Sequence, residues 1–286
     1  KGVGEVVCPA LIDFVNAAPC LFDESLREPA FLETFSKQLV EIAPYNAAIF
    51  VWQAADPKYV AFSHPNLQID NGYFWRTPEG KMECGLLDWC GGTRLPFVAS
   101  WMGSVSGMEP DVLLAHDEGL MRCFADEYAK CGGPTLDASD LLTRFRLAYL
   151  GLMLGILGFV ASGDVYKQGL SKEDYATLSG RKDERLMGVW ELRCNVTMIV
   201  KCLGYWAKRD IHGEVLSWAR EHKLDQGLYS WPPMPGIWRR GQPYRPWLYE
   251  EKGALPSFLE SSFTSKREYE KWIEEQGDRY GPGSVK

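Results

Sequence analysis

The fold is decided by the stretch His64-Pro65-Asn66-Leu67-Gln68-Ile69-Asp70-Asn71, which is followed, after sixteen intervening residues, by Asp88-Trp89. Between these two sequences lie an aromatic, strand-like run at 73–75 and a second strand-like run at 82–87. The residues Thr77-Pro78-Glu79-Gly80 that separate the runs are typical of a turn. The sequence therefore predicts an antiparallel β-hairpin.

The predicted hairpin brings two polar side chains together at its open end. In an antiparallel pair the start of the first strand lies beside the end of the second. The midpoint of the turn falls between Pro78 and Glu79, so Asn71 and Asp88 should come within about one residue pair of facing each other. A carboxamide and a carboxylate are thus expected at one spot.

The spacing of these residues matches a phosphoryl-transfer pattern. In the protein-kinase pattern H-R-D-L-x-x-x-N the Asp is the catalytic base and the Asn holds a metal, while a second Asp after a strand pair holds Mg²⁺. Here His64, Leu67 and Asn71 stand at the matching offsets, and Asp88 ends the hairpin. The combination is more specific than any of these residues alone.

At this level the sequence resembles the aminoglycoside phosphotransferase and choline kinase-like family. Members of that family show an H-G-D-x-x-x-x-N loop and an I-D-W ending, to which Gly85-Leu86-Leu87-Asp88-Trp89 is similar. Protein kinases have Phe-Gly after the metal-binding Asp, where this chain has Trp89-Cys90. The resemblance covers roughly residues 29–225 and implies a helical kinase-like C-terminal lobe. It also implies metal-ligand positions for Asn71 and Asp88 and a structural role for His64.

The chain departs from the family pattern at the catalytic base, where Asn66 replaces Asp. An amide oxygen accepts a hydrogen bond but takes no proton near neutral pH. Loss of a general base typically costs about 10²–10⁴-fold in rate. Pro96-Phe97-Val98-Ala99 keeps only part of the P-x-x-D-L-A type segment that is common in the family.

The region before His64 is also unlike a kinase. Its 63 residues show no phosphate-covering loop with a lysine, beyond a fragment at Gly2-Val3-Gly4. Because the first residue is Lys1 and not Met, we expect the chain to be a piece of something longer. An N-terminal lobe would then lie upstream of Lys1 or on another chain.

Two other interpretations of the motif remain open. Asn66 and Asn71 could simply hydrogen-bond the loop backbone, with Asp88 paired to a base such as Arg94. The match could also be accidental. No cofactor is expected under these interpretations, whereas Mg²⁺ and ATP are expected if the metal site is retained.

Composition narrows the class of protein. The 286 residues are 46% hydrophobic and carry a formal net charge of −7, which disfavours a general nucleic-acid binder. The eight cysteines form no C-x-x-C pair, and no signal peptide is visible. We expect free thiols in a reducing compartment, the cytoplasm or the interior of an organelle, rather than a secreted protein.

The rest of the chain reads as mostly helical, with an irregular segment at 1–28, where Pro9 and Pro19 flank a short apolar run. Helices are predicted at 29–55, at 111–131 and at 186–222, the last with a break near 210–213. Residues 147–162 are uncharged but fall short of the roughly 20 residues that cross a bilayer. They are interpreted as a buried core helix, with a membrane helix as the alternative.

The last part of the chain, 228–286, is predicted to be an extended Pro/Trp-rich arm that ends in a short charged helix near 265–276. Aromatic and arginine side chains are favoured anchors at protein interfaces. The predicted partner-binding residues are Trp231, Trp238, Arg239, Arg240, Arg245 and Trp247. The expected partner is therefore a protein and not nucleic acid, and membrane association is expected only through a complex.

Together these features predict an α+β, mostly α chain with a kinase-like lobe at 29–227. We expect a catalytically degenerate, pseudokinase-like domain that serves as a structural or interaction subunit of a larger assembly. The alternative is the C-terminal part of a Mg-ATP-dependent small-molecule phosphotransferase acting on an alcohol group.

Overall fold

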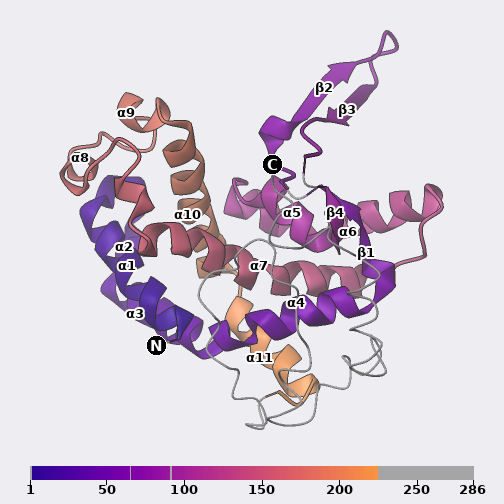
Figure 1. Cartoon of the computed structure of the whole chain (residues 1–286), viewed down its shortest axis with the longest axis horizontal. Helices are drawn as coiled ribbons and strands as arrows, with labels where there is room; N and C mark the ends of the chain where they lie inside the picture. The colour runs from indigo at the N-terminus through magenta and orange to yellow at the C-terminus, as the bar shows by residue number, and fades with distance from the viewer. Residues whose placement is uncertain (1, 65, 91, 225–286) are drawn as a thin grey trace, which may run out of the picture. The chain divides into compact units, whose positions relative to one another are not determined.

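The computed structural model describes residues 2–64, 66–90 and 92–224. The chain divides into two compact units, residues 1–215 and residues 216–286. The described elements are mostly helical, which confirms the predicted α+β, mostly α class (Figure 1). The helices are α1 Val3–Ala17, α2 Glu24–Arg27, α3 Pro29–Ile42, α4 Asn46–Ala55, α5 Phe97–Val105, α6 Pro110–Lys130, α7 Ala138–Ala161, α8 Lys172–Ala176, α9 Glu184–Met187, α10 Trp190–Lys208 and α11 Ile211–Glu221. The strands are β1 Val60–Ser63, β2 Gly72–Arg76, β3 Met82–Leu86 and β4 Thr93–Pro96.

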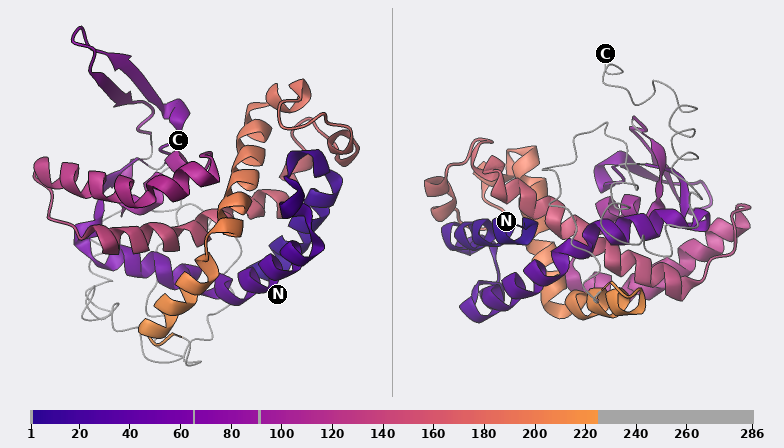
Figure 2. Two further views of the ribbon diagram at one scale, coloured as in Figure 1. Left: turned by 180° about the vertical axis from the view of Figure 1, so that it is seen from behind. Right: turned by 60° about the horizontal axis from the view of Figure 1, so that its bottom comes forward.

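Helix α7 forms the centre of the first unit. It begins at the N-cap Asp137, whose carboxylate accepts hydrogen bonds of 2.8 Å from the backbone N–H groups of Ser139 and Asp140. It contacts α1, α4, α5, α6 and α10, which surround it in Figures 1 and 2. Among the described helices it alone is long and apolar enough to cross a membrane, but most of its apolar stretch is buried within the protein. This packing supports the core-helix interpretation of residues 147–162.

The prediction of an irregular segment at 1–28 is wrong, because α1 and α2 lie within it. Pro9 stands inside α1, where proline removes one backbone hydrogen bond. The buried side chains of Val7, Leu11 and Phe14 recur on one face of α1 and offset this cost by packing. Proline alone was therefore a poor guide to the end of regular structure.

The helix predicted at 29–55 is divided in two. A 3₁₀ turn at Ala43–Tyr45 separates α3 from α4. Pro44 within this turn has no N–H to continue the α-helical ladder. The predicted helices at 111–131 and 186–222 are confirmed as α6 and as α10 with α11, which are separated at Arg209 and Asp210.

The strands form two separate antiparallel pairs. β2 pairs with β3, which confirms the predicted hairpin. β1 pairs with β4, an element that the sequence did not predict, and brings Ser63 opposite Thr93. The chain between Ser63 and Thr93 contains the motif-bearing stretch 64–71, called the candidate loop below, and the hairpin. It therefore leaves the helical body and returns to it at neighbouring points.

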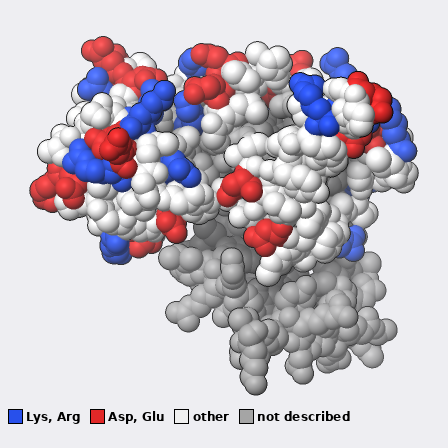
Figure 3. Space-filling view, turned by 90° about the horizontal axis from the view of Figure 1, so that it is seen from above, with Lys and Arg blue, Asp and Glu red and all other residues white. Residues whose placement is uncertain are grey.

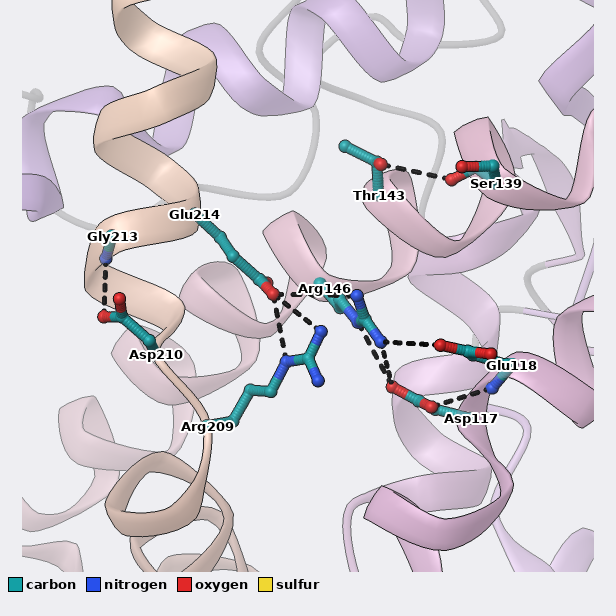
Figure 4. Close-up of polar contacts among 9 residues, drawn as sticks. All are labelled: Asp117, Glu118, Ser139, Thr143, Arg146, Arg209, Asp210, Gly213 and Glu214. Atoms are coloured by element: carbon teal, nitrogen blue, oxygen red, sulfur yellow. Dashed lines mark hydrogen bonds and ion pairs between the residues drawn. The ribbon is translucent and has the colours of Figure 1, made fainter.

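An ion-pair network fastens the helices around α7 (Figure 4). Asp117 on α6 is buried and accepts bonds of 3.1 and 2.9 Å from Nε and Nη2 of Arg146 on α7. Arg146 Nη1 also lies 3.7 Å from Oε1 of Glu214, which pairs with Arg209 at 2.8 Å. Two basic and two acidic side chains thus neutralise each other where a lone buried charge would be costly.

A second buried cation positions the start of β1. The guanidinium of Arg144 on α7 lies 4.1 Å from the ring centre of Trp52 and 3.8 Å from that of Tyr59. Its Nε also pairs with Asp140 at 3.2 Å. Cation–π contacts of this kind strengthen when they are removed from water. Because Tyr59 directly precedes β1, this contact ties the candidate loop to the core helix.

The described part of the second unit, 216–224, consists of the end of α11 and its cap. The N–H of Leu224 donates to the carbonyl of Ala219 at 2.8 Å, and Lys223 has a φ of +59°. This is the backbone pattern that closes many helices. The predicted arm at 228–286 and its charged helix lie outside the described residues.

Charges on the face shown in Figure 3 are interspersed. Acidic and basic side chains lie beside one another there, and no large basic area is visible on this face.

Candidate functional site

The candidate loop is anchored on α5 by its backbone. The carbonyl of Leu67 accepts a hydrogen bond of 2.6 Å from the hydroxyl of Ser104. At Gly103 a Cβ atom would lie 3.0 Å from the same carbonyl oxygen. The glycine therefore permits the close approach that this bond needs.

His64 ties the loop to the end of the hairpin. Its buried ring lies with Nε2 2.7 Å from the carbonyl oxygen of Leu87, while Nδ1 accepts the N–H of Asn66 at 3.1 Å. A carbonyl can only accept and a backbone N–H can only donate. These two contacts therefore select the neutral ring with its proton on Nε2, and the structural position given to His64 fits this geometry.

The two asparagines brace the loop from within. Asn71 Nδ2 donates a bond of 2.7 Å to the backbone carbonyl of Asn66. The side-chain oxygen of Asn66 in turn accepts a hydrogen bond from Nε2 of Gln68. Asn71 thus bonds the loop backbone, as one interpretation of the motif expected of both asparagines. The side chain of Asn66 instead bonds the side chain of Gln68.

The hairpin register places Asn71 and Asp88 close together, as predicted. Gly72 pairs with Leu86, and the N–H of Leu87 donates to the carbonyl of Asn71 at 2.8 Å. Asp88 is the next residue along the chain. The turn is centred on Glu79 and not between Pro78 and Glu79, because Thr77 pairs with Lys81 and Gly80 has a φ of +80°.

Asp88 has an unusual backbone and an unpaired carboxylate. Its φ of +52° lies in the left-handed region, which costs a non-glycine residue about 1 kcal/mol. Within the described ranges neither Asp88 nor Arg94 forms an ion pair, so the expected pairing between them is not present. A strained residue with a free, exposed carboxylate is a reason to look for a ligand.

Apolar side chains cover the hairpin and the residues around it. Trp89 stacks on Phe62 with ring centres 5.9 Å apart and meets the edge of His64 at 5.0 Å. Tyr73 and Trp75 stack at 5.3 Å on the hairpin itself. The exposed large apolar residues of this region are Phe62, Ile69, Tyr73, Phe74, Trp75, Met82, Leu86, Leu87 and Trp89. The sequence predicted the strands but missed this exposure, which three consecutive aromatic residues at 73–75 could have signalled because they must occupy both faces of a strand.

The metal-binding capacity of the site rests on Asn71 and Asp88. Across the residues with described positions, no group of three or more His, Cys, Asp or Glu side chains could hold a metal ion. One carboxylate and one amide oxygen would leave most of the coordination of Mg²⁺ to water and phosphate oxygens, as is usual for that ion.

The sequence also made predictions for the cysteines and for the partner-binding residues of the arm. All eight cysteines are free thiols. Burial raises the pKa of Cys202 to about 12, and burial also raises the pKa of Cys8. The predicted partner-binding residues Trp231, Trp238, Arg239, Arg240, Arg245 and Trp247 lie outside the described residues.

Comparison with known proteins gives no relative. No family model, no curated protein and no solved structure matches this chain.

Proposed function

We propose that this chain is a catalytically degenerate, kinase-like domain that acts as a structural or interaction subunit of a larger assembly. The observation that carries the proposal is the state of Asn66, at the position where the kinase pattern has its base. Its amide oxygen is occupied by Gln68, and its carbonyl by Asn71. An amide held in this way braces the loop and takes no proton from a substrate hydroxyl.

The kinase-like part of the proposal draws support from the arrangement around the hairpin. His64 bonds the backbone at the end of β3, and Asn71 and Asp88 lie at the open end of the same hairpin. This is the arrangement that the resemblance to aminoglycoside phosphotransferases and choline kinases implies. Because all three residues keep these positions without a base, we assign the loop a structural role.

The interaction part draws support from the exposed apolar hairpin. Tyr73, Phe74 and Trp75 are 48%, 58% and 41% exposed, on a two-stranded sheet that is marginally stable alone. Contiguous apolar surface of this kind marks an interaction site more often than a free surface. A protein partner is expected here and, as the sequence predicts, also on the arm.

The alternative function is the C-terminal part of a Mg-ATP-dependent phosphotransferase. The unpaired, left-handed Asp88 beside Asn71 favours it, since strain at a free carboxylate suits a metal ligand. In this case Asn71 and Asp88 would hold Mg²⁺, and Asn66 would orient the substrate hydroxyl.

Calorimetric titration with Mg-ATP separates the two functions. The wild-type chain, Asp88→Ala and Asn66→Asp would be compared, with Asp126→Ala as a control that removes an exposed carboxylate elsewhere. The proposal expects no saturable heat from any of them. Saturable binding by the wild type that is lost in Asp88→Ala and kept in Asp126→Ala would establish the alternative instead.

Cross-linking of the native assembly tests the interaction role. The amine of Lys81 at the hairpin tip is well exposed and reachable by a lysine cross-linker. We expect links from Lys81 to another polypeptide, and a chain ending at residue 227 should keep these links while losing those made by the arm. Only intrachain links from Lys81 would argue against an interface at the hairpin.

A further inference from the structure

The outer edge of β2 carries free backbone groups. The hydrogen-bonded pairs at Asn71–Leu87 and Thr77–Lys81 set the alternation along the hairpin. By this alternation Tyr73 and Trp75 face β3, whereas the N–H and C=O groups of Phe74 and Arg76 point away from it. The hairpin projects from the helices in Figures 1 and 2, and none of the described strands pairs with this edge.

β2 lacks the features that usually protect a strand edge. Proteins block such edges with proline, lysine or a bulge. Gly72–Arg76 contains none of these and holds three consecutive aromatic residues, which favour strands. β3 is less suited to pairing, because Glu83 and Gly85 lie inside it, whereas the glycine and the charged residue of β2, Gly72 and Arg76, stand at its two ends. The open edge of β2 is therefore the stronger site for an added strand.

The sequence of β2 is complementary to itself in the antiparallel direction. A register centred on Phe74 places Phe74 opposite its own copy and Tyr73 opposite Trp75 of the other chain. Phe74 then uses both of its outward backbone groups, and the N–H of Arg76 can donate to the carbonyl of Gly72 in the other copy, so the hydrogen-bonding phase agrees with the register. The N–H of Gly72 donates to the carbonyl of Ile69 within its own chain and adds no bond. Tyr73 and Trp75 form non-hydrogen-bonded pairs, in which side chains lie closest.

The charges agree with the same register. Arg76 lies opposite Gly72 of the second copy, and the exposed carboxylate of Asp70 stands two residues before Gly72, in the 3₁₀ turn Ile69–Asn71 that leads into β2. Arg76 donates to the carbonyl of Gly80 but pairs with no carboxylate in the described part of the chain, and Asp70 is exposed without an ion pair there. Two-fold symmetry would form this pair twice.

We propose that β2 binds β2 of a second copy of this chain, so that two hairpins form one four-stranded antiparallel sheet. The inference deepens the proposed interaction role, since it names the partner at the hairpin. It does not depend on whether the loop binds Mg-ATP, so failure of either proposal can be recognised separately.

Sedimentation velocity over a concentration series tests this pairing with the full chain. We expect a reversible dimer. Phe74→Glu puts two carboxylates opposite each other at the symmetry axis and should weaken the dimer at least tenfold, by roughly 1.4 kcal/mol. Val112→Glu, which places the same charge on an exposed apolar residue of α6 outside the hairpin, is the matched control and should leave the dimer nearly intact.

A charge exchange gives the sharper test. Arg76→Asp and Asp70→Arg should each weaken the dimer, because each places like charges together, and the double variant should restore it. Circular dichroism confirms that each variant is folded, since all the altered side chains are exposed in one copy. A wild-type chain that stays monomeric at every concentration would overturn the proposal, and so would dissociation by Val112→Glu but not by Phe74→Glu. Failure of the double variant to recover would overturn the register.

Discussion

The Nε2 atom of His64 lies 2.7 Å from the carbonyl oxygen of Leu87, which is 23 residues away in sequence. This contact joins the start of the candidate loop to the end of the hairpin. With the second bond, from the N–H of Asn66 to Nδ1, it makes His64 a buried connector between two segments that are otherwise exposed.

Replacing His64 by alanine should therefore destabilise the loop. It removes two hydrogen bonds and leaves space in a buried position, so we expect a loss of about 1–3 kcal/mol in the free energy of unfolding. Denaturant titration measures this. His116→Ala is the control, since His116 is exposed on α6, and its stability should be unchanged. Equal stability of both variants would show that the His64 bonds contribute nothing net.

Replacing Asp88 by glycine should relieve backbone strain. With a φ of +52°, Asp88 occupies a conformation that glycine adopts freely, so we expect a gain of up to about 1 kcal/mol in Asp88→Gly. Asp88→Ala keeps the strain and should show no gain. If Asp88→Gly is instead less stable than the wild type, the carboxylate has a stabilising contact in solution.

Replacing Gly4 by alanine should separate α1 from α3. A Cβ at Gly4 would lie 2.8 Å from the Cα of Val40, which is closer than packed atoms approach, so we expect a loss of about 1–3 kcal/mol. Gly119→Ala on α6 is the matched change, because nothing lies within 4 Å of its added Cβ. It should gain up to about 1 kcal/mol from helix propensity, and thermal unfolding should show opposite signs for the two variants.

Removing the carboxylate of Asp117 should disrupt the network of Figure 4. Asp117→Ala leaves Arg146 without its main buried partner, so we expect a loss of about 2 kcal/mol or more. Glu118 is exposed and lies 4.0 Å from the same guanidinium, so Glu118→Ala should change stability by less than about 0.5 kcal/mol. Similar losses in both variants would mean that burial does not decide the strength of these pairs.

The protein should lose stability in alkali. Burial raises the pKa of Cys202, Tyr166 and Tyr205 to about 12 each, above the usual values of 9.0 for a thiol and 10.0 for a phenol. The folded chain therefore holds protons that the unfolded chain releases. The stabilisation is complete below about pH 9 and is lost as the pH rises towards 12. In a titration from pH 8 to 12, part of the tyrosinate absorbance should rise late and cooperatively, together with unfolding. Titration of all tyrosines near pH 10 would contradict this prediction.

The sequence predicted the elements whose signals are local. The hairpin followed from two strand-like runs around Thr77-Pro78-Glu79-Gly80, and the juxtaposition of Asn71 and Asp88 followed from antiparallel geometry alone. Helix α7 was expected from the apolar run at 147–162.

Elements that depend on distant contacts were missed. Pro9 made α1 look irregular, because the packing that tolerates it comes from residues far along the chain. The pairing of β1 with β4 joins short strands about thirty residues apart, and neither has a pattern of its own. The absence of an ion pair between Asp88 and Arg94 depends on side-chain direction, which sequence spacing does not fix.

The pairing of Ser63 with Thr93 has a further consequence for how this chain could change. The two ends of the segment between these residues meet, so its length is not set by the helices, and its carbonyl at Leu67 is held by Ser104 on α5. A short linker could close the gap between the two ends, and a different loop could be inserted there, without re-routing the backbone elsewhere. The stretch that bears the motif can in this sense be exchanged as a unit while β1 and β4 stay paired.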